Sequence, residues 1–143
     1  MLKEQYSLLL VDDSEDDRLF IRRAILRQPR LRIVGEVCDG EEAISYLDGR
    51  GIYQDRQKYP LPDAMLLDLK MPKRTGHEVL QWLHGQSYDE MFIAVVSGSF
   101  LPEDVARSMA YGAHAYFKKT ALKLEQEAML REIIQRLDKA HAL

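Results

Sequence analysis

YSLLLVDDSEDD, residues 6–17, carries the strongest fold signal in the chain. Residues 6–11 form a largely apolar run that ends at two acids, which is typical of a strand buried on both faces. Ser14 follows as a predicted helix N-cap, and Asp16 and Asp17 fall in the first helical turn, where the helix dipole favours negative charge. The stretch therefore predicts a strand that leads directly into a helix, and we interpret residues 15–17 as a solvated helix start.

The same strand-helix pattern recurs four more times. Further strands are predicted at residues 31–38, 64–69, 92–97 and 115–118. The first helix ends before Pro29, and the later helices are predicted from Asp39 to Gly49, from 77 to Gly85, from Pro102 to Gly112 and from about 122 to 140. Residues 50–62 form an unusually long polar connection. Apolar strands that alternate with helices predict an α/β fold, (βα)5, with a doubly wound parallel five-stranded sheet.

Length and composition set further limits. The 143 residues suit one domain, and 20 Lys and Arg against 23 Asp and Glu give a net charge of -3, so a direct nucleic-acid partner is not expected. No apolar run approaches the ~20 residues that span a bilayer, and the first residues lack a signal-peptide core. The lone Cys38 is interpreted as a small buried hydrophobe. We expect a cytoplasmic protein without membrane contact.

Polar side chains follow the predicted strands where ligands of open parallel sheets bind, beyond the carboxyl ends. These side chains belong to Asp12, Asp13, Asp68, Ser97, Lys118 and Lys119, and Gly98 leaves room beside Ser97. Clustered carboxylates need a neutralising cation, and a set of oxygen ligands suits Mg²⁺. A carboxylate can also act as a nucleophile toward phosphorus, with the metal and a lysine offsetting charge on the phosphoryl group. The pattern predicts phosphoryl chemistry at Asp68.

Four motifs strengthen this interpretation: LLVDDSEDD (9–17), LLDLKMPKRTG (66–76), VVSGS (95–99) and GAHAYFKK (112–119). In this order and spacing they resemble the chemotaxis-regulator-like receiver domain of bacterial two-component response regulators. The resemblance covers essentially all of residues 1–143. It implies a flavodoxin-like strand order 2-1-3-4-5, a single receiver domain without an effector domain, and a phosphoacceptor switch rather than an enzyme.

The resemblance also implies a role for each matching residue. Asp68 becomes the phosphoacceptor, and Mg²⁺ is held by Asp68, by Asp13 directly, by Asp12 through bound water and by the backbone carbonyl of Lys70. Ser97 and Lys119 assist the transfer of the phosphoryl group. Ser97 and Tyr116 form the switch. Lys70 and Ser99 influence the lifetime of the phosphoryl group. Thr75 and Thr120 depart from the Asp and Pro that are common at these two positions.

The expected function is that of a single-domain response regulator, phosphorylated on Asp68 by a sensor histidine kinase and acting through protein contact. The long polar insert resembles that of stand-alone cyanobacterial phytochrome response regulators, which hints at a phytochrome-type kinase. A downstream protein or a second copy is expected on the face of the fourth helix, fifth strand and fifth helix, with Arg107, Tyr111 and Lys118. Two alternatives remain: a phosphorylation-independent binding module, and a phosphotransfer intermediate or phosphate sink.

Overall fold

The computed structural model describes residues 3–86, 88 and 90–142. Five parallel strands form one sheet in the order β2-β1-β3-β4-β5. The strands are β1 (Tyr6–Val11), β2 (Leu31–Val37), β3 (Ala64–Leu67), β4 (Phe92–Ser97) and β5 (Ala115–Lys118). The helices are α1 (Glu15–Leu26), α2 (Gly40–Asp48), α3 (Gly76–His84), α4 (Pro102–Ala110), α5 (Lys123–His141) and the short 3-10 helix η1 (Gly51–Gln54). The predicted (βα)5 fold and strand order 2-1-3-4-5 are confirmed.

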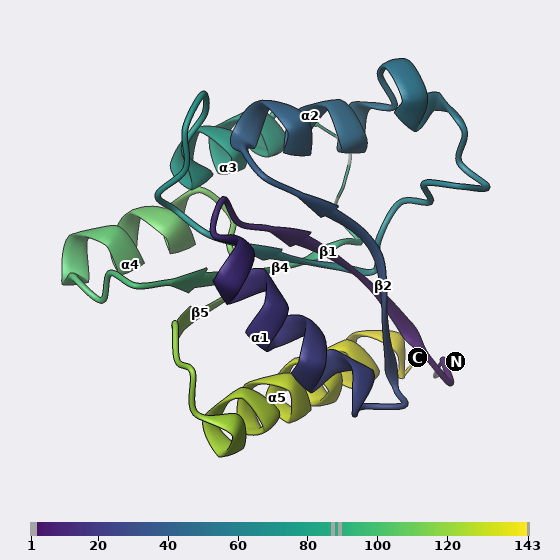
Figure 1. Cartoon of the computed structure of the whole chain (residues 1–143). Coiled ribbons are helices and arrows are strands. Elements are labelled where there is room, and N and C mark those ends of the chain that lie inside the picture. Colours follow the sequence, from purple (N-terminus) through teal and green to yellow (C-terminus); the bar gives the residue numbers. More distant parts are fainter. Residues whose placement is uncertain (1–2, 87, 89, 143) are drawn as a thin grey trace.

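The helices cover both faces of the sheet (Figure 1). On one face α1 packs against α5, and on the other α2 packs against α3, with α4 beside α3 and β5. All six residues of β1 are buried. Leu8 and Leu10 point into the cluster under α1 and α5, whereas Leu9 and Val11 point into the cluster under α2 and α3. This two-sided burial explains why the first strand shows no apolar-polar alternation.

Two strands end earlier than their sequence pattern predicts. β3 ends at Leu67, so Asp68 is the first residue beyond it. β2 ends at Val37, and Cys38 is exposed, so the interpretation of Cys38 as a buried residue is wrong. Val37 is the last β2 residue paired with β1, and the chain then turns toward the N-cap Asp39. Cys38 therefore lies beyond the carboxyl end of β2, where it is exposed.

The polar connection after α2 is more ordered than its composition indicates. It contains η1, and the rings of Tyr53 and Tyr59 pack on Tyr46 of α2, with ring centroids 4.9 and 6.0 Å from that ring. Arg56 donates hydrogen bonds of 2.8 Å to the carbonyls of Tyr46 and Leu47. These carbonyls lie in the last turn of α2, where backbone acceptors lack partners within the helix. The insert is thus fastened to α2 and leaves the carboxyl edge of the sheet free.

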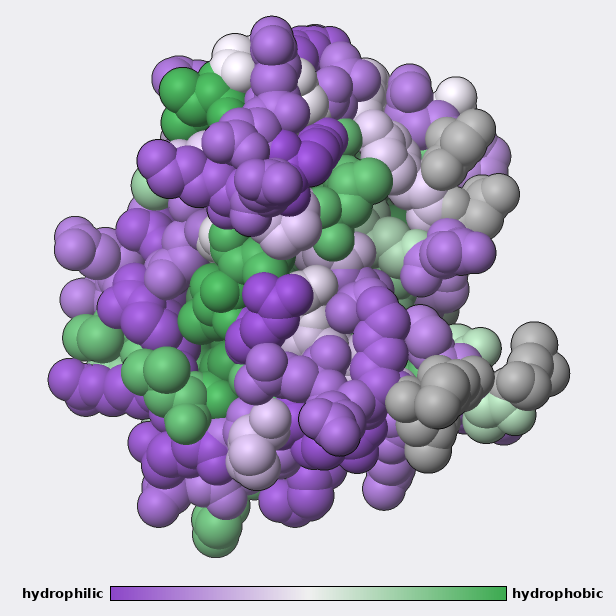
Figure 2. All heavy atoms as spheres, turned by 90° about the vertical axis from the view of Figure 1, so that its right-hand side faces the viewer, coloured by the Kyte–Doolittle hydropathy of each residue, from purple (hydrophilic) through white to green (hydrophobic). Residues whose placement is uncertain are grey.

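Both described chain ends lie at the amino end of the strands (Figure 1). Arg30 connects β1 and α5, because it lies over the ring of Tyr6 and bonds to Asp138. Its Nη2 donates to Asp138 Oδ1 at 2.7 Å, and Tyr6 Oη donates to the same oxygen at 2.6 Å. Arg30 Nε also donates to the Glu4 carbonyl at 3.0 Å. Figure 2 shows this side as mainly polar, with a band of hydrophobic side chains through its middle. Among the described helices, none is long and apolar enough to cross a bilayer.

Candidate functional site

Asp12 and Asp13 follow β1 at the carboxyl edge of the sheet. Asp12 Oδ1 accepts a hydrogen bond from the Ser14 backbone N–H at 2.9 Å, and Arg18 donates to the Asp12 carbonyl. Ser14 in turn caps α1, as predicted, by accepting from the Asp17 N–H at 3.2 Å. The turn between β1 and α1 is therefore fixed by its own polar groups. The carboxylate of Asp13 remains exposed.

Asp68 stands at the matching position after β3, and its side chain is only 6% exposed. Its backbone N–H donates to the Val11 carbonyl at 2.9 Å, which continues the pairing of β1 and β3 by one bond. A Cβ atom on Gly76 would lie 2.3 Å from the Asp68 carbonyl oxygen. Only glycine at the start of α3 therefore lets this helix begin directly against the backbone of Asp68.

Asp12, Asp13 and Asp68 form a candidate metal centre, because one carboxylate oxygen from each lies within 4.8 Å of the others. Three carboxylates from two neighbouring strand ends offer only oxygen ligands, and such donors are preferred by Mg²⁺, which also retains several waters. The predicted grouping of these three residues is confirmed. The position of the Lys70 carbonyl as a further ligand stays a prediction.

The electrostatics of Asp68 reflect its crowded surroundings. Burial raises the pKa of Asp68 above its usual range; the ammonium of Lys119 opposes this rise, and the negative charge of Asp12 adds to it. A divalent cation at the cluster would favour the ionised form of all three acids. The donor set therefore fits a hard cation both in its chemistry and in its charge.

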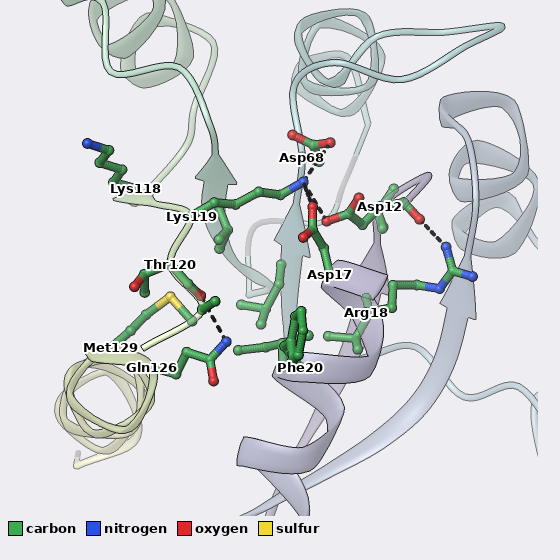
Figure 3. A pocket seen from close by; sticks show the side chains of 16 residues that line it. Asp12, Asp17, Arg18, Phe20, Asp68, Lys118, Lys119, Thr120, Gln126 and Met129 are labelled. Atoms are coloured by element: carbon green, nitrogen blue, oxygen red, sulfur yellow. Dashed lines mark hydrogen bonds and ion pairs between the residues drawn. The ribbon is translucent and has the colours of Figure 1, made fainter. Parts of the chain in front are cut away.

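Lys119 provides the positive charge of the site (Figure 3). Its Nζ lies 2.9 Å from Asp12 Oδ2, 2.8 Å from Asp17 Oδ2 and 3.2 Å from Asp68 Oδ2. Burial alone would lower the pKa of Lys119, but its hydrogen bonds to Asp17 and Asp12 and the charge of Asp68 outweigh burial and raise that pKa. The neighbouring carboxylates therefore favour the charged form of Lys119. Lys118 points away from the acids (Figure 3), so the choice of Lys119 over Lys118 agrees with the geometry.

Asp17 is a site residue that the sequence reasoning missed. It was interpreted as part of a solvated helix start, yet its carboxylate makes the shortest contact to Lys119. A signal was present in the sequence: the first turn of a helix that follows a strand end must lie at the same edge of the sheet as the ligands. Asp16, its neighbour, is exposed and fits the solvated interpretation.

Ser97, Ser99 and Tyr116 form a connected group beside the acids. Ser97 is fully buried, and its Oγ accepts from the Ser99 backbone N–H at 3.1 Å. Tyr116 Oη donates to the Ser99 carbonyl at 2.6 Å, and Ser99 Oγ donates to Asp104 in the first turn of α4. Ser99 thus links the two predicted switch residues to the start of α4.

Lys70 is exposed on the loop between β3 and α3. This loop is held against the start of α2, because Arg74 Nε lies 2.7 Å from Glu41 Oε2 and a Cβ on Gly40 would meet the Arg74 carbonyl. Thr75 ends the loop with a capping box: its Oγ1 accepts from the Glu78 N–H, and Glu78 accepts from the Thr75 N–H. The C-terminal end of the loop that carries Lys70 is therefore fixed.

A cleft of about 220 Å³ runs from the acids into the space between α1 and α5 (Figure 3). Asp68 and Lys119 line its polar end, and Phe20 and Met129 line its apolar part. The Thr120 carbonyl, beside Lys119, accepts from Gln126 Nε2 at 2.9 Å. The cleft gives the site an open side next to α1.

Comparison with known families fits this arrangement of three carboxylates, a lysine and a buried hydroxyl. Residues 8–134 match the response regulator receiver domain. The chain belongs to this family. The candidate metal centre of Asp12, Asp13 and Asp68 lies within the matched residues. The resemblance that the four motifs indicate is confirmed at the level of the family.

Two solved receivers have similar folds over nearly their whole length. The phosphorylated cyanobacterial phytochrome response regulator RcpA is 28% identical with a TM-score of 0.76, and the match covers 94% of this chain and 92% of RcpA. The Mn²⁺-bound response regulator Rcp1 is 27% identical with a TM-score of 0.73, and the match covers 90% of this chain and 91% of that protein.

A curated relative shows a different domain context. NarL, the nitrate/nitrite response regulator of Escherichia coli K12, is 32% identical over 133 residues, which is 93% of this chain and 55% of NarL. The chain therefore spans about half the length of this curated relative. Similarity to NarL thus concerns the receiver and not the activity of the whole regulator.

Proposed function

We propose that this receiver accepts a phosphoryl group on Asp68 from the phosphohistidine of a sensor histidine kinase. One observation carries the proposal: the Asp68 carboxylate is nearly buried, lies beside Asp12 and Asp13, and has Lys119 Nζ 3.2 Å from its Oδ2. A carboxylate in such a charged, partly desolvated setting can act as a nucleophile toward phosphorus when cations offset the added charge. RcpA, a relative solved in its phosphorylated form, supports this chemistry.

In the proposed step, an Asp68 oxygen attacks phosphorus while the P–N bond to the kinase histidine breaks. The electron pair of that bond stays on the imidazole nitrogen. Lys119 pairs with the negative charge of the phosphoryl oxygens. Ser97 then turns its hydroxyl to donate a hydrogen bond to one of these oxygens. The chain positions and neutralises the transferred group, and the kinase supplies the leaving group.

The metal of this reaction is proposed to be Mg²⁺. Its ligands would be Asp13, Asp68 and the Lys70 carbonyl, with Asp12 acting through a bound water. When bound, Mg²⁺ supplies positive charge against the carboxylates and the transferring phosphoryl group. The Mn²⁺-bound form of Rcp1 supports a divalent cation in a receiver of this kind.

The output is proposed to run through Ser97, Ser99 and Tyr116. A move of the Ser97 hydroxyl toward a phosphoryl oxygen breaks its bond with the Ser99 N–H, and Ser99 in turn holds Tyr116 and α4. The signal thereby reaches the face of α4, β5 and α5, where we expect a downstream protein or a second copy of the chain to bind. The likeness to phytochrome response regulators favours a phytochrome-type kinase as phosphodonor.

Asp68→Asn tests the proposal, with Asp48→Asn as a control that removes an equal charge from the exposed end of α2. Each protein is incubated with acetyl phosphate and Mg²⁺, and phosphate uptake is measured by intact mass. The parent and Asp48→Asn are expected to take up one phosphoryl group, and Asp68→Asn none. Uptake by Asp68→Asn would contradict the assignment of Asp68. Absence of uptake in all three proteins would favour a phosphorylation-independent binding module.

A further inference from the structure

The ammonium group of Lys119 contacts three carboxylates. The distances from Nζ are 2.8 Å to Asp17, 2.9 Å to Asp12 and 3.2 Å to Asp68. Nζ donates hydrogen bonds to Asp17 and Asp68 and forms an ion pair with Asp12, so three carboxylates compete for one ammonium group. Figure 3 shows the three carboxylates converging on Nζ, with Asp17 approaching from α1.

Two of the three partners also belong to the candidate metal centre. Asp12 and Asp68 share the cluster with Asp13, so a divalent cation and Lys119 draw on the same carboxylates. A phosphoryl group on Asp68 would likewise need one of the Lys119 donors. Asp17 is the partner that lies outside the metal cluster, and its bond to Lys119 can persist when the cation binds.

Asp17 is well placed for a lasting contact. Its backbone N–H is held by the Ser14 hydroxyl at 3.2 Å, which fixes the first turn of α1. Its side chain is 42% exposed, whereas that of Asp68 is 6% exposed. A half-hydrated carboxylate can keep its charge at little desolvation cost. Asp17 therefore offers Lys119 an anionic partner that the metal and phosphoryl group do not need.

We propose that Asp17 is a positioning residue that acts through Lys119. It draws the ammonium toward α1 and so lowers the competition between Lys119 and the divalent cation for Asp12 and Asp68. The inference deepens the proposed function and rests on it. Without the carboxylate of Asp17, Lys119 would pair more strongly with Asp12 and Asp68, and the cation would have to displace that pairing.

Mg²⁺ titration by calorimetry of the unphosphorylated full chain tests this role, with the parent, Asp17→Asn and Asp16→Asn compared. Asp16→Asn removes the same charge from the adjacent, exposed position of α1 and controls for long-range electrostatics. Asp17→Asn is expected to weaken Mg²⁺ binding about fivefold, and Asp16→Asn less than about twofold. Equal affinities of the two variants would overturn the proposal.

A double-mutant cycle with Lys119→Met separates action through Lys119 from direct action on the metal. In the Lys119→Met background, Asp17→Asn is expected to change Mg²⁺ affinity no more than Asp16→Asn does. A loss of affinity as large as in the parent background would mean that Asp17 acts on the cation directly, and would overturn the proposal. A parent protein that binds no Mg²⁺ would instead contradict the proposed function on which the inference rests.

Discussion

At the amino end of the sheet, Asp138 pairs with Arg30 at 2.7 Å, whereas at the carboxyl end Asp68 shares the single ammonium of Lys119 with other acids. The hydrogen bond from Arg30 is the main cause that lowers the pKa of Asp138, while burial is the main cause that raises the pKa of Asp68. The charge of Asp138 is balanced by Arg30 within the folded chain. Asp68 lies in a cluster whose negative charge exceeds its positive charge, and this excess negative charge favours binding of a cation.

The two ends thus differ in kind: the Arg30–Asp138 contact stabilises the fold, whereas the acids around Lys119 form a candidate ligand-binding site. Substitutions at the amino end should change stability and leave phosphoryl chemistry intact. Substitutions at the carboxyl end should change the chemistry more than the stability.

Lys119→Met is expected to have the largest effect. It removes the positive charge that faces Asp68, and loss of such a preorganised charge lowers reaction rates by about 100-fold. The measurement is the initial rate of phosphorylation by acetyl phosphate at saturating Mg²⁺. Lys118→Met is the matched control, because the neighbouring Lys118 points away from the acids (Figure 3). Equal rates for the two variants would contradict the role of Lys119.

Asp138→Asn should lower the free energy of unfolding by about 1 kcal/mol, because it weakens the charged hydrogen bonds from Arg30 and Tyr6. Urea denaturation measures this change. Asp48→Asn, which loses only an exposed pair with Arg50, should stay within about 0.5 kcal/mol of the parent. Phosphorylation of Asp138→Asn by acetyl phosphate should match that of the parent. A large loss of phosphate uptake would contradict the separation between a stabilising amino end and a chemical carboxyl end.

The same variant carries a pH signature. Because the folded-state pKa of Asp138 is lowered, its stabilising effect is complete above the unfolded-state pKa near pH ~4 and is lost as the pH falls through the folded-state value. The stability gap between the parent and Asp138→Asn should therefore shrink below about pH 4. A gap that stays constant down to the lowest pH at which the parent folds would speak against this pairing.

Lys70→Ala should have the smallest effect. Lys70 is exposed on the loop two residues beyond Asp68. We expect its long side chain to limit the access of water to a phosphoryl group on Asp68. The variant should shorten the lifetime of the aspartyl-phosphate by about two- to threefold. The decay is followed after removal of acetyl phosphate, with Lys73→Ala of the same loop as control. Identical decay curves for the parent and Lys70→Ala would refute a role for this side chain.

Most of the fold and the centre of the site could be predicted from the sequence. Buried strands and helix caps are local patterns, and the strand ends carry Asp12, Asp13 and Asp68 to one edge whatever the details of packing. Asp17 was missed because its role depends on where the long side chain of Lys119 turns after β5. Cys38 was placed wrongly because an apolar residue at the end of a strand pattern does not reveal where pairing stops.

The structure of the insert after α2 could not be predicted from the sequence. Its Tyr53, Tyr59 and Arg56 stand in a polar, turn-rich stretch, and nothing in its local pattern indicates that they pack on α2. Contacts of this kind arise between segments joined by loops and depend on tertiary geometry. The Ser99 bonds to Ser97 and Tyr116 also depend on tertiary geometry, although the resemblance to receiver domains implies switching roles for Ser97 and Tyr116.

The central claim is that Asp68 carries the phosphoryl group. The deciding measurement is reduction of the phosphorylated parent protein with borohydride, which converts an aspartyl-phosphate to homoserine, followed by peptide mass mapping. Homoserine is expected at position 68 when Mg²⁺ and acetyl phosphate are both present, and none is expected when Mg²⁺ is chelated. Homoserine at Asp12, Asp13 or another aspartate, with position 68 unchanged, would contradict the assignment of Asp68.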